Sequence, residues 1–265
     1  MKKINRVEPS NFEYFPKDDK FEYSDSPALN FTYKESTPNI RISKNNLRSD
    51  EISKDTSLDV ILSAGCSTTF GVGLSEEETW PRILEKLIDK NNTIMYNISK
   101  PGWSAYQIIY NVFLYLRNFK KPLEIYVLLP DETRTLGYSI VHKSNATFFI
   151  LNGTKEDEET NEEIRLANSI HVKNYLFMLE EYCRVQGIKL FISTWCEKNF
   201  INNNHGFLNT YYPYNKKSAL EFIKKYEEEN PDSEFIFFAR DDHHQGVGYH
   251  SYWADMFYKI RQESL

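Results

Sequence analysis

The fold is decided by the stretch Leu58-Asp-Val-Ile-Leu-Ser-Ala-Gly-Cys-Ser-Thr-Thr-Phe-Gly-Val-Gly73, in which a run of β-forming residues stops at a glycine. The apolar run at 60–62 predicts a buried parallel strand, because a strand covered on both faces reads as an unbroken hydrophobic segment. A Gly-rich turn and an amphipathic helix follow. Ligands of open α/β sheets bind at the carboxyl ends of the strands. Ser67 is therefore a candidate nucleophile at that edge.

Strand-like and helical runs alternate from about residue 57 onward. We expect strands at 60–62, 94–98, 123–129, 188–194 and 235–238, and helices at 77–89, 105–118, 163–186 and 218–229, with a last helix ending near residue 262. This alternation predicts an α/β fold, a parallel sheet of about five strands with helices on both faces and right-handed crossovers.

Residues 1–54 differ in character from the domain at 55–265. Prolines recur there among polar residues and aromatics without a period of 2 or 3.6, so the segment cannot build a core of its own. We expect an extended aromatic N-terminal arm on the domain surface; the alternative is a strap for a protein partner or for self-association. The domain carries insertions near 138–163 and 198–234, and the acidic run at 156–159 is expected to be a solvated loop.

Composition excludes several classes of function. The 265 residues carry a formal charge of −6 with dispersed Lys and Arg, so we expect no nucleic-acid partner. There is no apolar run of about 18 residues and no secretory signal, so we expect no membrane span and a cytoplasmic protein. Cys66, Cys183 and Cys196 are too scattered for a disulfide framework and are expected to be reduced. Cys196 is expected to line the cleft.

Ser67 has alternative interpretations. A small residue after a strand-ending glycine also fills tight turns or binds phosphate. However, the stretch lacks the third glycine of G-x-G-x-x-G, and no G-x-x-x-x-G-K-S/T occurs. The G-x-S-x-G elbow is absent as well, because threonine occupies its last position.

Asp241 and His244 give the serine a chemical context. They lie three residues apart, just after the last expected strand and at the same sheet edge as Ser67. An aspartate in that position can accept the Nδ1 proton of the histidine, which leaves Nε2 to take a hydroxyl proton. A serine hydroxyl needs such a base, because it is a weak nucleophile at neutral pH.

Two other interpretations of this segment stay open. His243, His244, His250 and Asp241 could ligate a metal, although adjacent histidines point apart and no second ligand cluster is evident. The Asp-Asp-His-His run could also be an exposed polar loop without a task. We expect neither a metal nor a cofactor.

Three blocks together resemble the SGNH hydrolases, the GDSL esterase and lipase family. They are the turn at 65–73, the Pro101–Ser104 loop, and the segment at 239–250, which cover about residues 57–262 in order and spacing. The resemblance implies a three-layer flavodoxin-like fold and acyl transfer from carboxylic esters. Its implied triad is Ser67 as nucleophile, His244 as base and Asp241 as the orienting acid. The N–H groups of Ser67 and Gly102 would bind the oxyanion.

The third block departs from the family. Where the family ends its third strand with Gly-x-Asn-Asp, this chain has Pro130-Asp-Glu-Thr-Arg134. A carboxylate at Glu132 would repel a developing oxyanion, and losing one donor costs about 10²–10³ in rate. Either Thr133 or Arg134 substitutes as donor, or catalysis is weak or lost. Asp131 and Glu132 could equally cap the next segment.

The sequence thus favours a serine esterase or carbohydrate O-deacetylase that acts on a small ester or acylated sugar. Trp103, Trp195 and the Tyr211–Tyr214 loop could line a sugar-binding rim or fill the core. The alternative is a catalytically weakened module of the same fold with a structural or binding role in a larger assembly, associated with the virion if the chain is viral.

Overall fold

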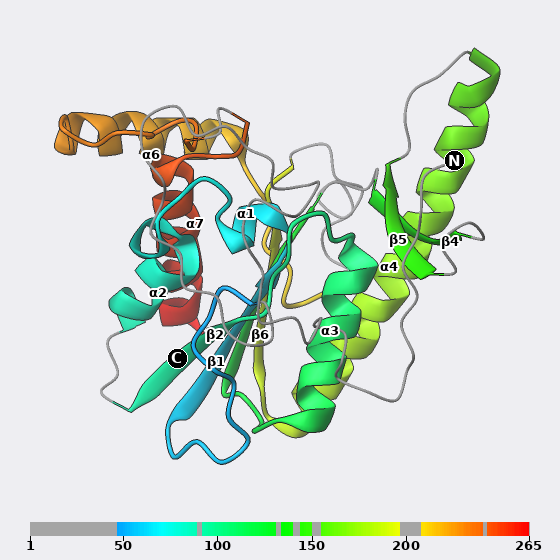
Figure 1. Cartoon of the computed structure of the whole chain (residues 1–265), viewed down its shortest axis with the longest axis horizontal. Helices are drawn as coiled ribbons and strands as arrows, with labels where there is room; N and C mark the ends of the chain where they lie inside the picture. Colours follow the sequence, from blue (N-terminus) through cyan, green and yellow to red (C-terminus); the bar gives the residue numbers. More distant parts are fainter. Residues whose placement is uncertain are drawn as a thin grey trace.

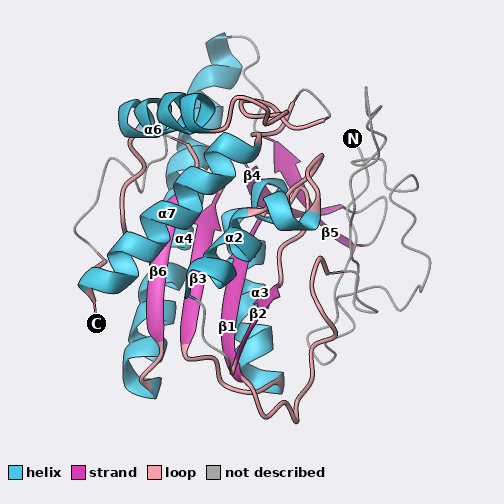
Figure 2. Ribbon diagram, turned by 90° about the vertical axis from the view of Figure 1, so that its left-hand side faces the viewer, coloured by secondary structure: helices cyan, strands magenta, loops and turns pink. Residues whose placement is uncertain are grey.

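The structure is a computed structural model that describes residues 47–88, 92–130, 134–139, 144–149, 155–196, 208–240 and 243–264, with the backbone alone at 134–139, 144–149 and 155–165. Its centre is a four-stranded parallel sheet in the order β2-β1-β3-β6 (Figure 2). The strands are β1 (Asp59–Gly65), β2 (Thr93–Asn97), β3 (Glu124–Leu129) and β6 (Lys189–Thr194). The predicted parallel α/β fold is confirmed.

This strand order puts β1 at the topological switch point. β1 pairs with β2 on one side, with Leu62 opposite Tyr96, and with β3 on the other, with Leu62 opposite Ile125. The chain leaves β1 for one neighbour and later returns to the other, so connections diverge at the carboxyl end of β1. In open α/β sheets this is where ligands bind.

Helices cover both faces of the sheet, as Figure 1 shows. On one face lie α3 (Ala105–Asn118) and α4 (Lys155–Gln186); on the other lie α2 (Trp80–Ile88) and α7 (Val247–Glu263). Alternate residues of β1 serve the two layers: Leu62 packs into the first core and Ile61 into the second, as the period of two in a strand requires. A short α1 (Ser67–Phe70) and a single 3-10 turn at 76–78 connect β1 to α2.

The expected fifth strand at 235–238 is wrong. In the described part of the chain this run forms a single bridge, Phe238 with Gln245. The carbonyls of Phe235, Ile236 and Phe237 accept hydrogen bonds of 2.9–3.0 Å from the first N–H groups of α7 and its cap. These helix-terminal donors would otherwise lack partners.

Beside β6, residues 210–212 form one parallel bridge through Ile192 and Tyr211.

The first insertion also differs from the expectation. Strands β4 (Arg134–Ser139) and β5 (Ser144–Phe149) form an antiparallel hairpin, and α4 begins at Lys155 rather than near residue 163. The acidic run at 156–159 is therefore helical and not a loop. The second insertion contains α6 (Lys216–Glu229).

Most of the N-terminal arm, residues 1–46, lies outside the described residues. The part that is described joins the domain: Leu47 is fully buried in the core on the α3 and α4 face, and Arg48 and Ser49 are buried beside it. The domain thus includes residues ahead of the expected boundary at 54/55. Within the described ranges, no helix combines the length and apolar character needed to cross a membrane.

Candidate active site at the carboxyl end of β1

Ser67 is placed by a tight turn from β1 into α1. A Cβ on Gly65 would lie 1.9 Å from Thr69 Oγ1 and 3.0 Å from the Leu128 carbonyl. A glycine is therefore required where the helix folds back over the strand end. Ser67 follows two residues later as the first residue of α1, and it is 5% exposed. The strand thus delivers the serine to the expected sheet edge.

The surroundings of the Ser67 hydroxyl contain a thiol. Ser67 Oγ lies 4.0 Å from Cys66 Sγ, and Trp195 Nε1 donates to that sulfur at 3.3 Å. Cys66 itself is fully buried in the core on the α3 and α4 face. The indole of Trp195 thereby holds the residue before Ser67.

Buried polar side chains fix the turn that follows Ser67. Arg48 donates to the carbonyl of Phe70 at 2.9 Å and also to the carbonyls of Gly71 and Leu74. This places a cation at the C-terminal end of α1, where carbonyls lack helical partners. Asn97, the last residue of β2, donates to the Thr69 carbonyl at 3.0 Å. The described end of the arm is therefore part of the site's scaffold.

Arg240 ties the last block to the same turn. Its guanidinium donates to Glu78 at 2.7 and 3.1 Å and to the Gly73 carbonyl at 3.3 Å. Burial opposes ionisation of Glu78, but the hydrogen bonds and charge of Arg240 prevail and lower the pKa of that carboxyl.

Gln245 of the last block contacts α1. Ala239 N–H donates to the His244 carbonyl at 2.9 Å, and Thr68 Oγ1 donates to Gln245 Oε1 at 3.1 Å. His244 therefore precedes a residue that contacts the direct neighbour of Ser67. Asp241 lies outside the described residues. Among the described residues, Ser67 Oγ lies within hydrogen-bonding range of Cys66 Sγ and of no other side chain. The expected hydrogen bond between His244 and Ser67 is therefore not formed in this structure.

His250 has a structural role. It is buried in α7, and its Nδ1 accepts a hydrogen bond of 2.9 Å from the backbone N–H of Trp80. Burial, with contributions of the same sign from the charges of Arg48 and His244, lowers the pKa of His250 to about 3. The lone pair on Nδ1 is engaged and unavailable to a metal. The described ranges contain no group of three His, Cys, Asp or Glu side chains that could hold one.

The remaining predicted residues fall into three groups. Gly102 has φ +80° in the loop after β2, and its N–H, like that of Ser67, donates to no residue in the described part of the chain. Trp103 is 7% exposed and packs in the core on the α3 and α4 face, which favours the core alternative over the rim. Thr133 lies outside the described residues, and the structure describes Arg134 by its backbone alone.

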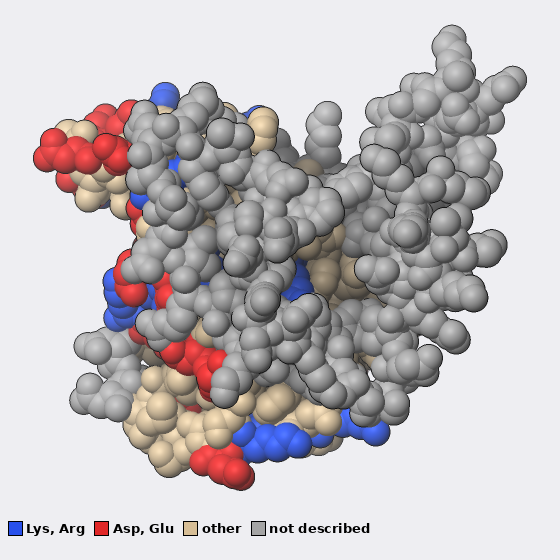
Figure 3. Space-filling model, in the orientation of Figure 1, with Lys and Arg blue, Asp and Glu red and all other residues tan. Residues whose placement is uncertain are grey.

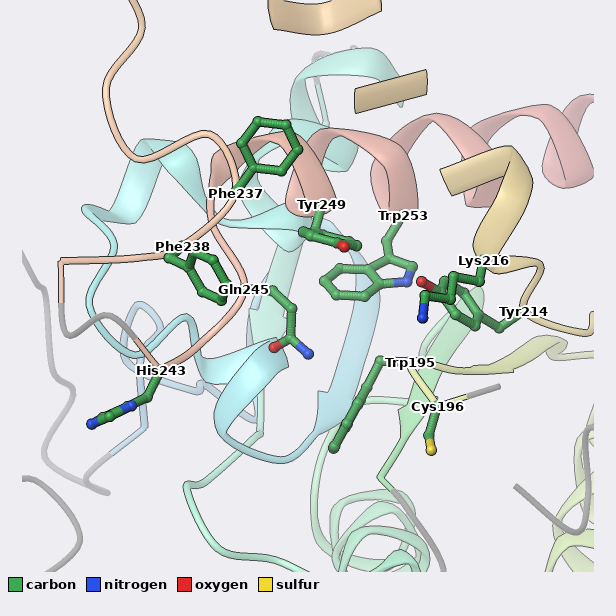
Figure 4. A pocket seen from close by; sticks show the side chains of 10 residues that line it. All are labelled: Trp195, Cys196, Tyr214, Lys216, Phe237, Phe238, His243, Gln245, Tyr249 and Trp253. Carbon is green, nitrogen blue, oxygen red and sulfur yellow. The ribbon is translucent and has the colours of Figure 1, made fainter. Parts of the chain in front are cut away.

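A pocket of about 460 Å³ opens beside the residues next to Ser67 (Figure 4). We call it the aromatic pocket; its lining is mostly aromatic and consists of Trp195, Cys196, Tyr214, Lys216, Phe237, Phe238, His243, Gln245, Tyr249 and Trp253. Trp195 holds Cys66 and Gln245 holds Thr68, so two lining residues contact the two neighbours of Ser67. Cys196 lines the pocket as expected.

Sequence reasoning missed several residues of this pocket. Trp253 and Tyr249 come from α7, Lys216 is the first residue of α6, and Gln245 lies within the last block without an expected role. The one available signal was the position of Gln245 directly after His244. Tyr211, by contrast, is buried in the core on the α3 and α4 face, whereas Tyr214 lines the pocket.

Several solved structures have a similar arrangement of the chain. The psychrotrophic esterase EstA from Pseudoalteromonas sp. matches at 12% identity over 77% of this chain and 97% of its own, with a TM-score of 0.45. TesA matches at 13% identity over 78% and 100%, with a TM-score of 0.44. A member of the lipolytic protein G-D-S-L family from Veillonella parvula DSM 2008 matches at 16% over 77% and 99%, with a TM-score of 0.36.

No protein-family model matches the chain, and no curated protein sequence does. TM-scores below 0.5 at these identities leave the activity to be argued from the site. What the described residues establish is an α/β protein with a parallel β2-β1-β3-β6 sheet. Its switch point carries Ser67, and two residues that line the aromatic pocket contact the neighbours of Ser67.

Proposed function

We propose that the protein is a serine hydrolase of the SGNH type that cleaves a carboxylic ester. The observation that carries the proposal is the meeting of two distant segments at the switch point. Ser67 begins α1 there, and Gln245 of the last block is held against the same helix by its 3.1 Å hydrogen bond with Thr68.

The proposed reaction follows from the properties of these side chains. Ser67 Oγ attacks the ester carbonyl while His244 takes its proton, and His244 then returns the proton to the leaving alcohol; water repeats the sequence on the acyl-enzyme. Asp241 would orient the imidazole. Such acid–base catalysis contributes about 10²–10⁴-fold. Catalytic hydrogen bonds often shorten when substrate binds, so this proposal assigns the Ser67–His244 hydrogen bond to the substrate complex.

The oxyanion of the tetrahedral intermediate needs donors that are not already engaged. The N–H groups of Ser67 and Gly102 meet this condition within the described residues, and each such donor is worth about 10²–10³ in rate. Thr133 or Arg134 would supply the donor that the family takes from asparagine. The substrate would be a small ester or an acylated carbohydrate, whose ring or acyl group the aromatic pocket would hold.

Hydrolysis of p-nitrophenyl acetate tests the proposal. We expect Ser67→Ala and His244→Ala each to lower kcat/KM by at least 10²-fold. The control His171→Ala, a histidine exposed on α4, should retain wild-type turnover. Acetylated sugars assayed in the same way would test the deacetylase form. Wild-type turnover in both Ser67→Ala and His244→Ala would remove the proposed nucleophile and base.

A second candidate function is a binding or structural module. The exposed side of α4 favours it, because six large apolar residues there are 39–67% exposed: Leu166, Ile170, Phe177, Met178, Tyr182 and Val185. Several large apolar side chains exposed on one helix are typical of an interface. Defined oligomers in light scattering, together with no reaction of Ser67 with a fluorophosphonate, would support this function; a monomer that is labelled at Ser67 would exclude it.

A further inference from the structure

The aromatic pocket contains a buried hydrogen-bond donor without an acceptor. Trp253 is fully buried in α7, and its Nε1 has no hydrogen-bond partner among the residues that the structure describes. Leaving a buried N–H unsatisfied costs about 1–3 kcal/mol. Figure 4 shows the indole nitrogen on the side of the ring toward Lys216 and Tyr214. A ligand atom that accepts this hydrogen bond would recover that cost.

Lys216 places a positive charge at the same end of the pocket. It is exposed, and it has no ion-pair partner in the described ranges, whereas its neighbour Lys217 pairs with Glu221 at 3.9 Å. In Figure 4 Lys216 and His243 lie at opposite ends of the pocket. None of the ten lining residues is acidic. The electrostatic environment therefore favours an anion.

The charges of α6 reinforce this polarity. Its first two residues, Lys216 and Lys217, are basic, and its last three, at 227–229, are acidic. Figure 3 shows the acidic atoms gathered at the outer end of this helix. Both placements oppose the helix dipole and cost the helix stability. The result is that the dipole and the lysines add their positive potential at the end of α6 that lines the pocket.

We propose that the aromatic pocket binds an anionic oxygen group, a carboxylate or a phosphate, carried by a ligand with a planar apolar part. One anionic oxygen would accept from Trp253 Nε1 and pair with Lys216 Nζ, while Trp195 and Tyr249 enclose the planar part. The ligand can be part of an ester substrate only if the proposed function holds, and to that extent the assignment rests on it. In that case the preferred substrates are esters that bear a negative charge away from the scissile bond.

Binding of phenylacetate and of its neutral isostere phenylacetamide, measured by calorimetry, tests the pocket without turnover. We expect phenylacetate to bind about tenfold more tightly, which corresponds to about 1.4 kcal/mol. Lys216→Met keeps the apolar stem and should abolish the difference, and Trp253→Phe should reduce it about threefold or more. The control Lys217→Met should preserve it. The difference should shrink in 0.5 M salt, because an exposed lysine is screened.

Phenyl phosphate in place of phenylacetate distinguishes the two anions; the group that binds more tightly identifies the class. Equal affinity for phenylacetate and phenylacetamide, no binding of any of the three, or a preference that survives Lys216→Met would overturn the assignment. Position is read from Cys196, which lines the pocket, whereas Cys66 and Cys183 are buried. Bound phenylacetate should slow alkylation of Cys196 by iodoacetamide; unchanged alkylation would place the ligand elsewhere.

Turnover supplies the link to the reaction. p-Nitrophenyl hemisuccinate should be preferred over p-nitrophenyl butyrate in kcat/KM by about tenfold, and Lys216→Met should remove that preference. If phenylacetate binds as expected but neither ester is hydrolysed, the proposed function fails and the pocket assignment stands. If both esters are hydrolysed without preference and phenylacetate does not bind, the pocket assignment fails and the proposed function stands.

Discussion

Replacing His250 by asparagine should reduce the free energy of unfolding that the protein loses when the pH falls from 7.5 to 5.0. Nδ1 of His250 accepts from the Trp80 N–H at 2.9 Å, so the folded state holds the ring neutral. Its pKa is lowered to about 3, mainly by burial, against about 6.5 in the unfolded chain. Asparagine can present an oxygen near the position of Nδ1 and cannot be protonated in this range.

The sign and size follow from proton linkage. Between pH 6.5 and 3 the unfolded chain binds one more proton at this site than the folded protein, so stability is lost as the pH falls. One pH unit corresponds to about 1.36 kcal/mol. From pH 7.5 to 5.0 the contribution of His250 therefore falls by about 2 kcal/mol.

Urea unfolding at pH 7.5 and 5.0 measures this contribution. The wild-type protein should lose about 2 kcal/mol more of its unfolding free energy over this interval than His250→Asn does. His171→Asn, at an exposed position of α4, should behave as the wild type. Equal losses in the wild-type protein and in His250→Asn would refute the assignment of a neutral, buried His250.

Three further substitutions test the fold around the site. Glu124→Gln should lower the unfolding free energy by about 3–5 kcal/mol, because it leaves the buried Arg261 without its charged partner at 2.8 Å; a loss like that of Glu181→Gln, in an exposed pair, would contradict this. Gly246→Ala should cost about 3 kcal/mol, since its Cβ would lie 2.0 Å from the Phe235 carbonyl. Gly187→Ala is the reference for backbone strain alone, because Gly187 has φ +66° and nothing lies within 4 Å of an added Cβ; a loss at Gly246 no greater than this strain of about 1–2 kcal/mol would show that the contact can relax. Tyr115→Phe should leave the urea concentration at the midpoint of unfolding unchanged or raise it, because the buried hydroxyl has no partner among the described residues. A clear decrease of this midpoint would contradict the prediction.

The sequence predicted the elements whose local pattern agrees with their packing. The helix at 105–118 was predicted to the residue, because its cap at Ser104 and its apolar face are both local features. The continuous apolar run of β3 marked a strand buried on both faces. The parallel orientation of the strands followed from the alternation of strand and helix segments.

The errors arose where tertiary contacts overrode a local pattern. The apolar run at 235–238 has the composition of a strand, but its carbonyls accept hydrogen bonds from the N-terminus of α7, which begins nine residues after the run ends. Nothing within the run itself signals this. The hairpin of β4 and β5 was missed, and so was the start of α4, because polar residues there were interpreted as a loop.

The candidate site was predictable in part. A strand that ends in Gly65 and a histidine block beyond residue 240 identified the sheet edge. The aromatic pocket was not predictable, because Trp195, Lys216 and Trp253 come from three elements that local patterns do not relate. His250 lies in the same block as His244, yet burial in α7 gives it a different role.

Reaction of the full chain with a fluorophosphonate, followed by peptide mapping, tests the central claim that Ser67 is a nucleophile activated by His244. We expect one adduct, on Ser67. Labelling should be absent in Ser67→Ala, at least 10²-fold slower in His244→Ala, and unchanged in Ser218→Ala, an exposed serine of α6. An adduct on another residue, no adduct, or an unchanged rate in His244→Ala would contradict the claim.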